Sequence, residues 1–285
     1  MAKTIATART VSELRGHLAK WRKADETVAL VPTMGALHDG HLSLIDLARR
    51  SADRVVVSIF VNPTQFGPRE DYRTYPRDEA GDVDKLGKAG ADLIFMPELA
   101  EMYPAGFSTT VKVCDLTNDL CGAARPNHFE GVATVVTKLL IQCDPDVAVF
   151  GEKDYQQLLA VRRLVRDLDI PVEILSAPIM RDPDGLALSS RNANLTPAQR
   201  RNAPVLYQTL AEIARDLESG KGCDATLVKA RSKLEAAGFR VDYVSVRHPE
   251  TLKALEGPVR QARVLAAAYL GQTRLIDNVP VPLKD

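Results

Sequence analysis

Residues 30–44 read LVPTMGALHDGHLSL. The apolar residues from Val28 to Val31 predict a buried β-strand, and the pattern after Gly40 predicts a helix. Two glycines and two histidines lie in the connection between them. Such a connection favours phosphate binding, because the free N–H groups and the positive dipole end of a helix N-terminus attract an anion. The segment therefore predicts one strand–helix unit of an α/β sheet, with a candidate phosphate site at its edge.

The alternation of apolar runs and helical patterns continues along the chain. Strands are expected near residues 28–31, 55–61, 92–96, 147–150 and 172–175, with helices between them. This order implies right-handed crossovers and a parallel sheet covered on both faces. Beyond Met180 the order changes, because a turn cluster at 181–185 precedes two long helical stretches and then strands near 241–247, 264–269 and 273–277. We therefore expect a separate small α+β domain, with the boundary near residue 182.

Composition and charge exclude several classes of protein. The 285 residues include 37 Lys plus Arg and 37 Asp plus Glu, so no global field favours nucleic acid or an anionic membrane. No apolar run approaches the roughly 20 residues that a membrane span needs. The four cysteines show neither Cys-x-x-Cys nor metal-ligand spacing, so we expect reduced thiols in the cytoplasm and no metal site.

Two histidines carry the first candidate site. His38 and His41 are three residues apart, so both can donate hydrogen bonds to phosphoryl oxygens in one cavity. Gly35 permits close approach of the backbone, and Gly40 opens the helix N-terminus. The simpler alternative is that each histidine only caps the helix or packs against it.

Three further segments carry polar groups that suit a nucleotide and a small acid. Asn62 and Gln65 follow the second expected strand, Lys153 and Asp154 follow the strand at 147–150, and residues 188–191 read LSSR after the turn cluster. Neutral amides read hydroxyls or carboxylates, while an ammonium and a hydroxyl–arginine group bind phosphate. Ordinary turns and a polar loop are the alternatives. Neither a Walker A motif nor Gly-x-Gly-x-x-Gly is present, which excludes the P-loop and dinucleotide types of site.

Taken in order, these segments resemble one family. The chain contains PTMGALHDGH at 32–41, VSIFVNPTQF at 57–66, FGEKD at 150–154 and LSSRN at 188–192, and it resembles the pantothenate synthetase family of the cytidylyltransferase-like nucleotidyltransferase superfamily. Further matching segments are Tyr75–Arg77, Arg125–Val132 and Arg274–Asn278.

The resemblance implies a fold, a reaction and a set of partners. It implies a Rossmann-like nucleotide- and pantoate-binding domain over residues 1–182, and a smaller C-terminal α+β lid domain over 183–285. The implied enzyme is an AMP-forming ligase that condenses (R)-pantoate with β-alanine through a pantoyl adenylate. Its cofactor set would be ATP as substrate with Mg²⁺ on the phosphates, and the enzyme would be a cytoplasmic homodimer. An adenylyltransferase that leaves AMP on its acceptor, or a non-catalytic nucleotide-binding module, remains an alternative.

The resemblance also implies roles for particular residues. The catalytic candidates are His41 as proton donor, with His38 and Lys153. Gln65 and Gln157 would hold pantoate, and Gln65 would also lie close to β-alanine. The ATP-binding candidates are Met34, Gly35, Ala36, Leu37, His38, Asp39, Gly40, His41, Gly151, Glu152, Lys153, Asp154, Met180, Leu188, Ser189, Ser190 and Arg191.

Overall fold

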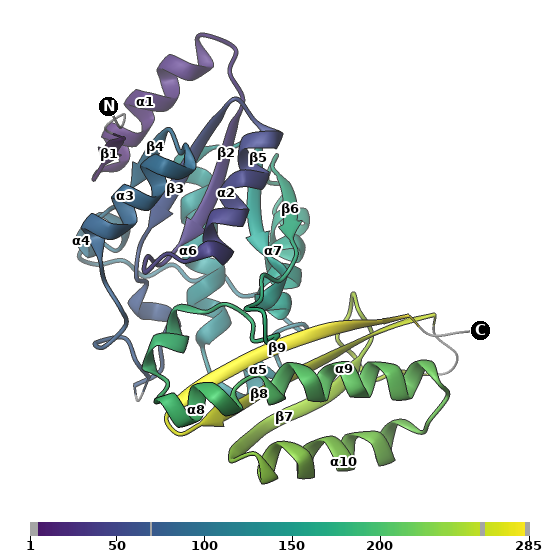
Figure 1. Cartoon of the computed structure of the whole chain (residues 1–285). Coiled ribbons are helices and arrows are strands. Elements are labelled where there is room, and N and C mark those ends of the chain that lie inside the picture. The colour runs from purple at the N-terminus through teal and green to yellow at the C-terminus, as the bar shows by residue number, and fades with distance from the viewer. Residues whose placement is uncertain (1–4, 69, 257–259, 283–285) are drawn as a thin grey trace. The chain divides into compact units, whose positions relative to one another are not determined.

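A computed structural model describes residues 5–68, 70–256 and 260–282 of the chain (Figure 1). These residues form two compact units. Unit 1 contains the described residues up to Glu152 together with Gln157–Pro178. Unit 2 contains Lys153–Gln156 together with the described residues from Ile179 onward. The functional division at residue 182 and the lid role of the second domain stay predictions.

Unit 1 is built on a six-stranded parallel sheet, as the alternating pattern predicts. Its strands are β1 (Ala6–Ala8), β2 (Val28–Thr33), β3 (Arg54–Ile59), β4 (Leu93–Phe95), β5 (Val147–Gly151) and β6 (Glu173–Ala177). Their order across the sheet is β1-β4-β3-β2-β5-β6. The chain moves outward from β2 in one direction and from β5 in the other, so the topological switch point lies between these two strands. In open α/β sheets, ligands bind at the carboxyl ends of the strands at this point.

Burial along β2 shows that both faces of this sheet are covered. All four residues from Val28 to Val31 are fully buried, although successive side chains of a strand point to opposite faces. Ala29 and Val31 pack in the core that α2 (Asp39–Ser51) covers with Leu44, Ile45 and Ala48. α6 (His128–Cys143) also contacts β2, and Figure 1 shows α2 and α6 on opposite sides of the sheet.

The remaining long helices of unit 1 lie between strands, as the alternating pattern predicts. The pattern Thr-x-x-Glu at residues 10–13 predicts a capping box, and Thr10 and Glu13 form it at the start of α1. β1 was not predicted, because its three residues, Ala-Thr-Ala, carry no strand pattern and pair only at the sheet edge with β4. The other helices of unit 1 are α1 (Val11–Arg22), η1 (Pro63–Gln65), α3 (Glu79–Ala89), α4 (Leu99–Met102), α5 (Cys121–Ala124) and α7 (Tyr155–Asp167), while η2 (Glu152–Asp154) and the first residues of α7 cross into unit 2.

Unit 2 confirms the predicted order of helices followed by strands. η3 (Ser190–Asn194), α8 (Pro197–Asn202), α9 (Val205–Glu218) and α10 (Cys223–Ala236) precede the antiparallel strands β7 (Phe239–Arg247), β8 (Gln261–Leu270) and β9 (Thr273–Pro282). α9 packs on β9 and β8, and α10 packs on β7. Alternate residues of β8, including Val264, Ala266 and Ala268, face the buried side chains of α9. Within the described ranges, no helix is long and apolar enough to cross a membrane.

Candidate active site

A buried carboxylate from α3 fixes the backbone conformation of the loop between β2 and α2. Asp82 accepts hydrogen bonds from the backbone N–H groups of Ala36 and Leu37, each at 2.8 Å. Gly35 and Ala36 both have positive φ, +80° and +51°. A Cβ added at Gly35 would lie 2.9 Å from Asp82 Oδ2, so glycine leaves room for the carboxylate. Lys85, one helical turn further along α3, donates to the carbonyl of Leu37 at 2.8 Å.

Asp82 is a positioning residue that sequence reasoning missed. Its side chain is almost fully buried, and on α3 it precedes the buried Leu86 by four residues. An aspartate at a core-facing helical position requires a partner, because a buried charge without hydrogen bonds is costly. This mismatch between residue type and helical face is the signal that could have found it.

His38 and His41 cap the helix that they begin. His38 Nδ1 accepts from the N–H of Gly40 at 3.1 Å, and His41 Nδ1 accepts from the N–H of His38 at 3.3 Å. The two ring centroids are 4.1 Å apart. An Nδ1 atom that accepts a hydrogen bond leaves the proton of a neutral imidazole on Nε2. Capping, the simpler alternative, is therefore present, and it selects the tautomer whose Nε2–H can donate to a phosphoryl oxygen.

The side chain of Gln65 is oriented by Asn62. Asn62 Nδ2 donates to the carbonyl of Gly131 and to Gln65 Oε1, both at 3.1 Å. Asn62 Oδ1 accepts from the Tyr103 hydroxyl at 2.8 Å, and burial raises the pKa of that hydroxyl, which keeps its proton in place. Gln65 Nε2 consequently faces Met34 Sδ at 3.0 Å. Because thioether sulfur is a weak acceptor, an oxygen of a substrate is a stronger partner for this N–H.

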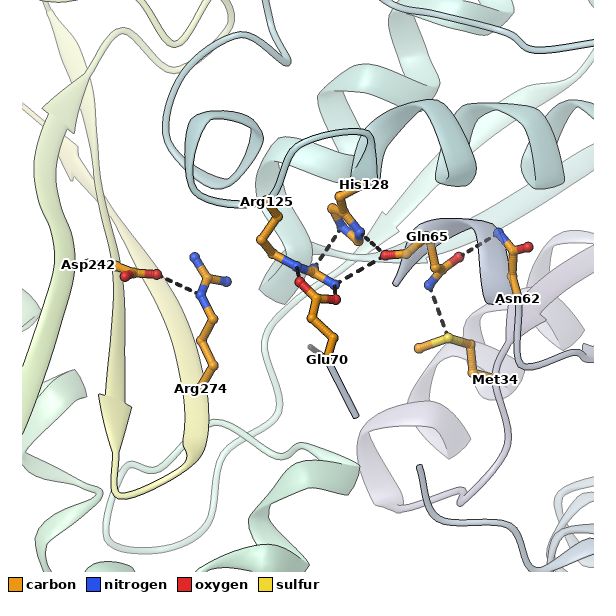
Figure 2. A network of polar contacts seen from close by, with 8 residues as sticks. All are labelled: Met34, Asn62, Gln65, Glu70, Arg125, His128, Asp242 and Arg274. Carbon is orange, nitrogen blue, oxygen red and sulfur yellow. Dashed lines mark hydrogen bonds and ion pairs between the residues drawn. The ribbon is translucent and has the colours of Figure 1, made fainter. Parts of the chain in front are cut away.

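A clamp of three side chains holds the backbone of Gln65 (Figure 2). Glu70 pairs with Arg125, whose Nε lies 2.7 Å from Glu70 Oε1 and whose Nη2 donates to the carbonyl of Gln65 at 3.3 Å. His128 Nδ1 lies 2.7 Å from the same carbonyl, and His128 Nε2 lies 3.0 Å from Arg125 Nη1. A carbonyl only accepts and a guanidinium only donates, so one neutral tautomer of His128, protonated on Nδ1, satisfies both contacts.

The end of β5 brings the third predicted segment to the switch point. β5 pairs with β2 in parallel, and its last residue is Gly151. Glu152 follows in η2, and Gln157 lies partly buried in the first turns of α7. Unit 1 therefore places the loop at residues 34–41 and the pair Gly151–Glu152 at the carboxyl ends of the two strands that flank the switch point.

Unit 2 holds the other predicted residues in two segments. Lys153 Nζ lies 3.8 Å from Asp154 Oδ2, and the backbone carbonyl of Lys153 accepts from Asn278 Nδ2 at 3.0 Å. Met180 and Leu188 are joined across a hairpin, in which the N–H of Leu188 donates to the carbonyl of Met180 at 2.9 Å.

The hydroxyl–arginine segment, residues 189–191, starts a short helical turn. Ser189 Oγ accepts from the N–H of Arg191 at 3.3 Å and thereby caps η3, which begins at Ser190. This cap fixes only the local turn at the start of η3. Its two hydroxyls and guanidinium have the chemistry that the sequence indicated for binding an anion.

No group of three or more His, Cys, Asp or Glu side chains in the described part of the chain is arranged to hold a metal ion. The fold and the loop at residues 34–41 define a doubly wound α/β protein whose His-x-Gly-His segment lies beside the topological switch point, the position at which this class binds its ligands.

The particular family follows from comparison with known proteins. The chain belongs to the pantoate–beta-alanine ligase family, whose profile matches residues 6–280. It is 56% identical to pantothenate synthetase of Rhodospirillum rubrum over 281 residues, which cover 98% of this chain and 100% of the relative.

Solved structures agree with this placement. Pantothenate synthetase from Thermus thermophilus is 50% identical, with a TM-score of 0.92 over 96% of this chain and 99% of that one. The pantoate–beta-alanine ligase of Francisella tularensis is 36% identical, with a TM-score of 0.81 over 96% of this chain and 97% of that one, and its structure is a complex with beta-gamma ATP and beta-alanine. These similarities confirm the fold class and the family that the sequence predicted.

Proposed function

We propose that this chain condenses (R)-pantoate with β-alanine to form pantothenate, using ATP and releasing AMP and pyrophosphate. The observation that carries the proposal is the match to the pantoate–beta-alanine ligase family over residues 6–280, with the His-x-Gly-His loop intact in a chain folded like its relatives. The loop selects the Nε2–H tautomer of both histidines, which suits transfer of an adenylyl group.

The reaction needs two steps, because a free carboxylate has no adequate leaving group. In the first step, a pantoate carboxylate oxygen attacks the α-phosphorus of ATP, the bond to the bridging oxygen breaks, and pyrophosphate leaves. In the second step, the deprotonated amine of β-alanine attacks the acyl carbon of pantoyl adenylate. The amide forms, the amine proton is lost to solvent or a base, and AMP leaves.

Negative charge develops on the phosphoryl oxygens in the first step, and we assign its stabilisation to three sets of groups. His41 in a proton-donor role and His38 would donate from Nε2, Lys153 would contribute an ammonium, and the hydroxyl–arginine segment at residues 189–191 would bind phosphate oxygens. Gln65 and Gln157 would hold pantoate. The orientation of Gln65 supports this role, because its N–H faces the weak acceptor Met34 Sδ. The backbone at residues 34–41 and 151–154, together with Met180 and Leu188, would line ATP.

Magnesium enters this proposal as part of the substrate. Mg²⁺ commonly binds through nucleotide phosphates and one or two carboxylates rather than through a cage made only of protein ligands. We therefore propose that the cation arrives with ATP. Asp154, whose carboxylate lies 3.8 Å from Lys153 Nζ, is one of two carboxylates in the predicted ATP segment at residues 151–154.

Homodimer formation and cytoplasmic location also belong to the proposal. Both are expected from the family resemblance, and free thiols at all four cysteines suit a reducing compartment. Light scattering after size-exclusion chromatography tests the dimer: a mass near twice the 31.2 kDa of the chain is expected, and a mass of one chain contradicts it.

ATP–pyrophosphate exchange tests the first step. Exchange should require pantoate and should proceed without β-alanine, and mass spectrometry should detect pantoyl adenylate under those conditions. His41→Ala should abolish exchange while leaving the circular dichroism spectrum unchanged. Exchange driven by a phosphorylated acceptor would instead identify an adenylyltransferase, and ATP binding with no acyl adenylate under any condition would identify a non-catalytic module.

A further inference from the structure

Two adjacent polar side chains are buried in β9, in a segment for which the proposed reaction gives no role. Asp277 and Asn278 are 4% and 2% exposed. Buried polar groups persist where their hydrogen bonds are satisfied, so the partners of these two residues show what they stabilise. Both sets of partners belong to unit 2 and lead to segments that carry predicted ATP-binding residues.

Asn278 holds the backbone of Lys153. Its Nδ2 donates to the Lys153 carbonyl at 3.0 Å, and its Oδ1 accepts from Arg263 Nε at 2.7 Å. A guanidinium only donates, which fixes the orientation of the amide and directs the N–H₂ group at Lys153. Arg263 is itself fixed, because its guanidinium stacks on the ring of Tyr155 at 3.9 Å, and the Tyr155 hydroxyl donates to the carbonyl of Pro249 at 3.0 Å.

Asp277 holds the hairpin that leads to the hydroxyl–arginine segment. Arg181 forms a two-point ion pair with it, with Nη1–Oδ2 and Nη2–Oδ1 distances of 2.6 and 2.8 Å. The same guanidinium donates to the carbonyl of Gly185 at 3.1 Å and stacks on Tyr207 at 3.9 Å. Arg181 directly follows Met180, and it forms an antiparallel β-bridge with Ala187, the residue before the segment at 188–191. The position of that segment therefore depends on a carboxylate of β9.

We propose that Asp277 and Asn278 are positioning residues that hold the two ATP-binding segments of unit 2, Lys153–Asp154 and Leu188–Arg191, on one rigid strand. The inference rests on the proposed function, which assigns phosphate contacts to these segments. The lysine side chain has four rotatable bonds, so its ammonium is held in place only if its backbone is anchored. Misplacement of a charge-stabilising group by about 1 Å can cost on the order of a hundredfold in rate.

A double-mutant cycle separates positioning from a general loss of stability. Asn278→Asp is nearly isosteric and keeps an acceptor for Arg263, but it replaces the N–H donor that faces the Lys153 carbonyl. The assay is pantoate-dependent ATP–pyrophosphate exchange, compared among the full-length wild-type protein, Asn278→Asp, Lys153→Ala and the double variant. Asp242→Asn is the matched control, because Asp242 forms a partly buried ion pair with Arg274 at 2.8 Å in the same sheet (Figure 2).

The expected result is a loss that depends on Lys153. Asn278→Asp should lower kcat/KM for ATP about ten- to hundredfold in the wild-type background and by less than about twofold in the Lys153→Ala background. Asp242→Asn should leave exchange within about twofold of wild type. Equal losses in both backgrounds, or full activity of Asn278→Asp, overturn the inference while the proposed function stands. Absence of pantoate-dependent exchange in the wild-type protein overturns both.

Asp277 is tested through its partner. Arg181→Lys keeps the positive charge but cannot form the two-point pair. We expect an increase of KM for ATP of about tenfold or more, with a thermal unfolding midpoint close to that of Asp242→Asn. An unchanged KM, or a change in KM that Asp242→Asn reproduces, shows that the hairpin does not need this anchor.

Discussion

Asp82→Asn is the sharpest test of how the loop after β2 is held. The wild-type carboxylate accepts two backbone hydrogen bonds at 2.8 Å, from Ala36 and Leu37, in an almost fully buried position. Asparagine has nearly the same shape but presents only one acceptor, so its N–H₂ group must face one of the two N–H donors. The change therefore removes one charge-assisted hydrogen bond and leaves one buried N–H without an acceptor.

The structure sets the size of the expected effect. A hydrogen bond to a charged group contributes roughly 1.5–3 kcal/mol, and we expect Asp82→Asn to lower the free energy of unfolding by about 2 to 3 kcal/mol. Ala36 holds a φ of +51°, which is unfavourable for a residue with a Cβ and persists only while neighbours impose it. Because a partly populated loop conformation weakens apparent affinity in proportion, we expect the ATP affinity to fall by about tenfold.

Urea unfolding and equilibrium ATP binding measure the two effects. Asp84→Asn is the control, since Asp84 lies on the same helix, is largely exposed and pairs with Lys88 four residues further on. It should change the free energy of unfolding by less than about 0.5 kcal/mol and leave ATP affinity unchanged. If Asp82→Asn binds ATP as tightly as Asp84→Asn does, the carboxylate does not hold the loop and the reasoning is wrong.

The remaining predictions concern packing and pH. Gly131→Ala should lower the free energy of unfolding in urea by about 3 kcal/mol, because the added Cβ would lie 2.3 Å from the backbone oxygen of Thr64. Gly16→Ala is the control, because this position in α1 has open space around it, and the change should raise the free energy of unfolding by about 0.5–1 kcal/mol. A mild effect at Gly131 would contradict the close approach of α6 to η1. Burial raises the pKa of Glu70, but its hydrogen bond and ion pair with Arg125 outweigh this and hold that pKa below the usual 4.5. Its contribution to stability is therefore present above about pH 4.5 and is lost as the pH falls below that value, so the unfolding free energy should decline more steeply on acidification for wild type than for Glu70→Gln, and parallel curves would refute this assignment.

Much of the fold follows from local sequence pattern. The apolar runs and helical spacing determined the strands β2 to β9, because burial of a strand or helix face requires that periodicity in the chain itself. The Thr10–Glu13 capping box could likewise be predicted, since both partners lie within one helical turn. β1 was missed because a three-residue edge strand exists only through its pairing with β4.

The sequence likewise predicted some features of the candidate site and not others. His38 and His41 could be predicted, because a glycine-containing strand-to-helix turn with two histidines carries its chemistry within a few residues. The tautomer of those histidines could not, since it depends on which ring nitrogen reaches a backbone N–H in the folded loop.

The side chains that hold the site were decided by tertiary structure alone. Asp82 reaches Leu37 across 45 residues, His128 reaches the carbonyl of Gln65 across 63, and Asn278 reaches Lys153 across 125. None of these pairings has a local pattern, because each arises only when packed elements bring a donor and an acceptor to within about 3 Å. Sequence alone determined which reactive groups the chain carries and in what order. Long-range packing decided which buried polar residues hold those groups in place.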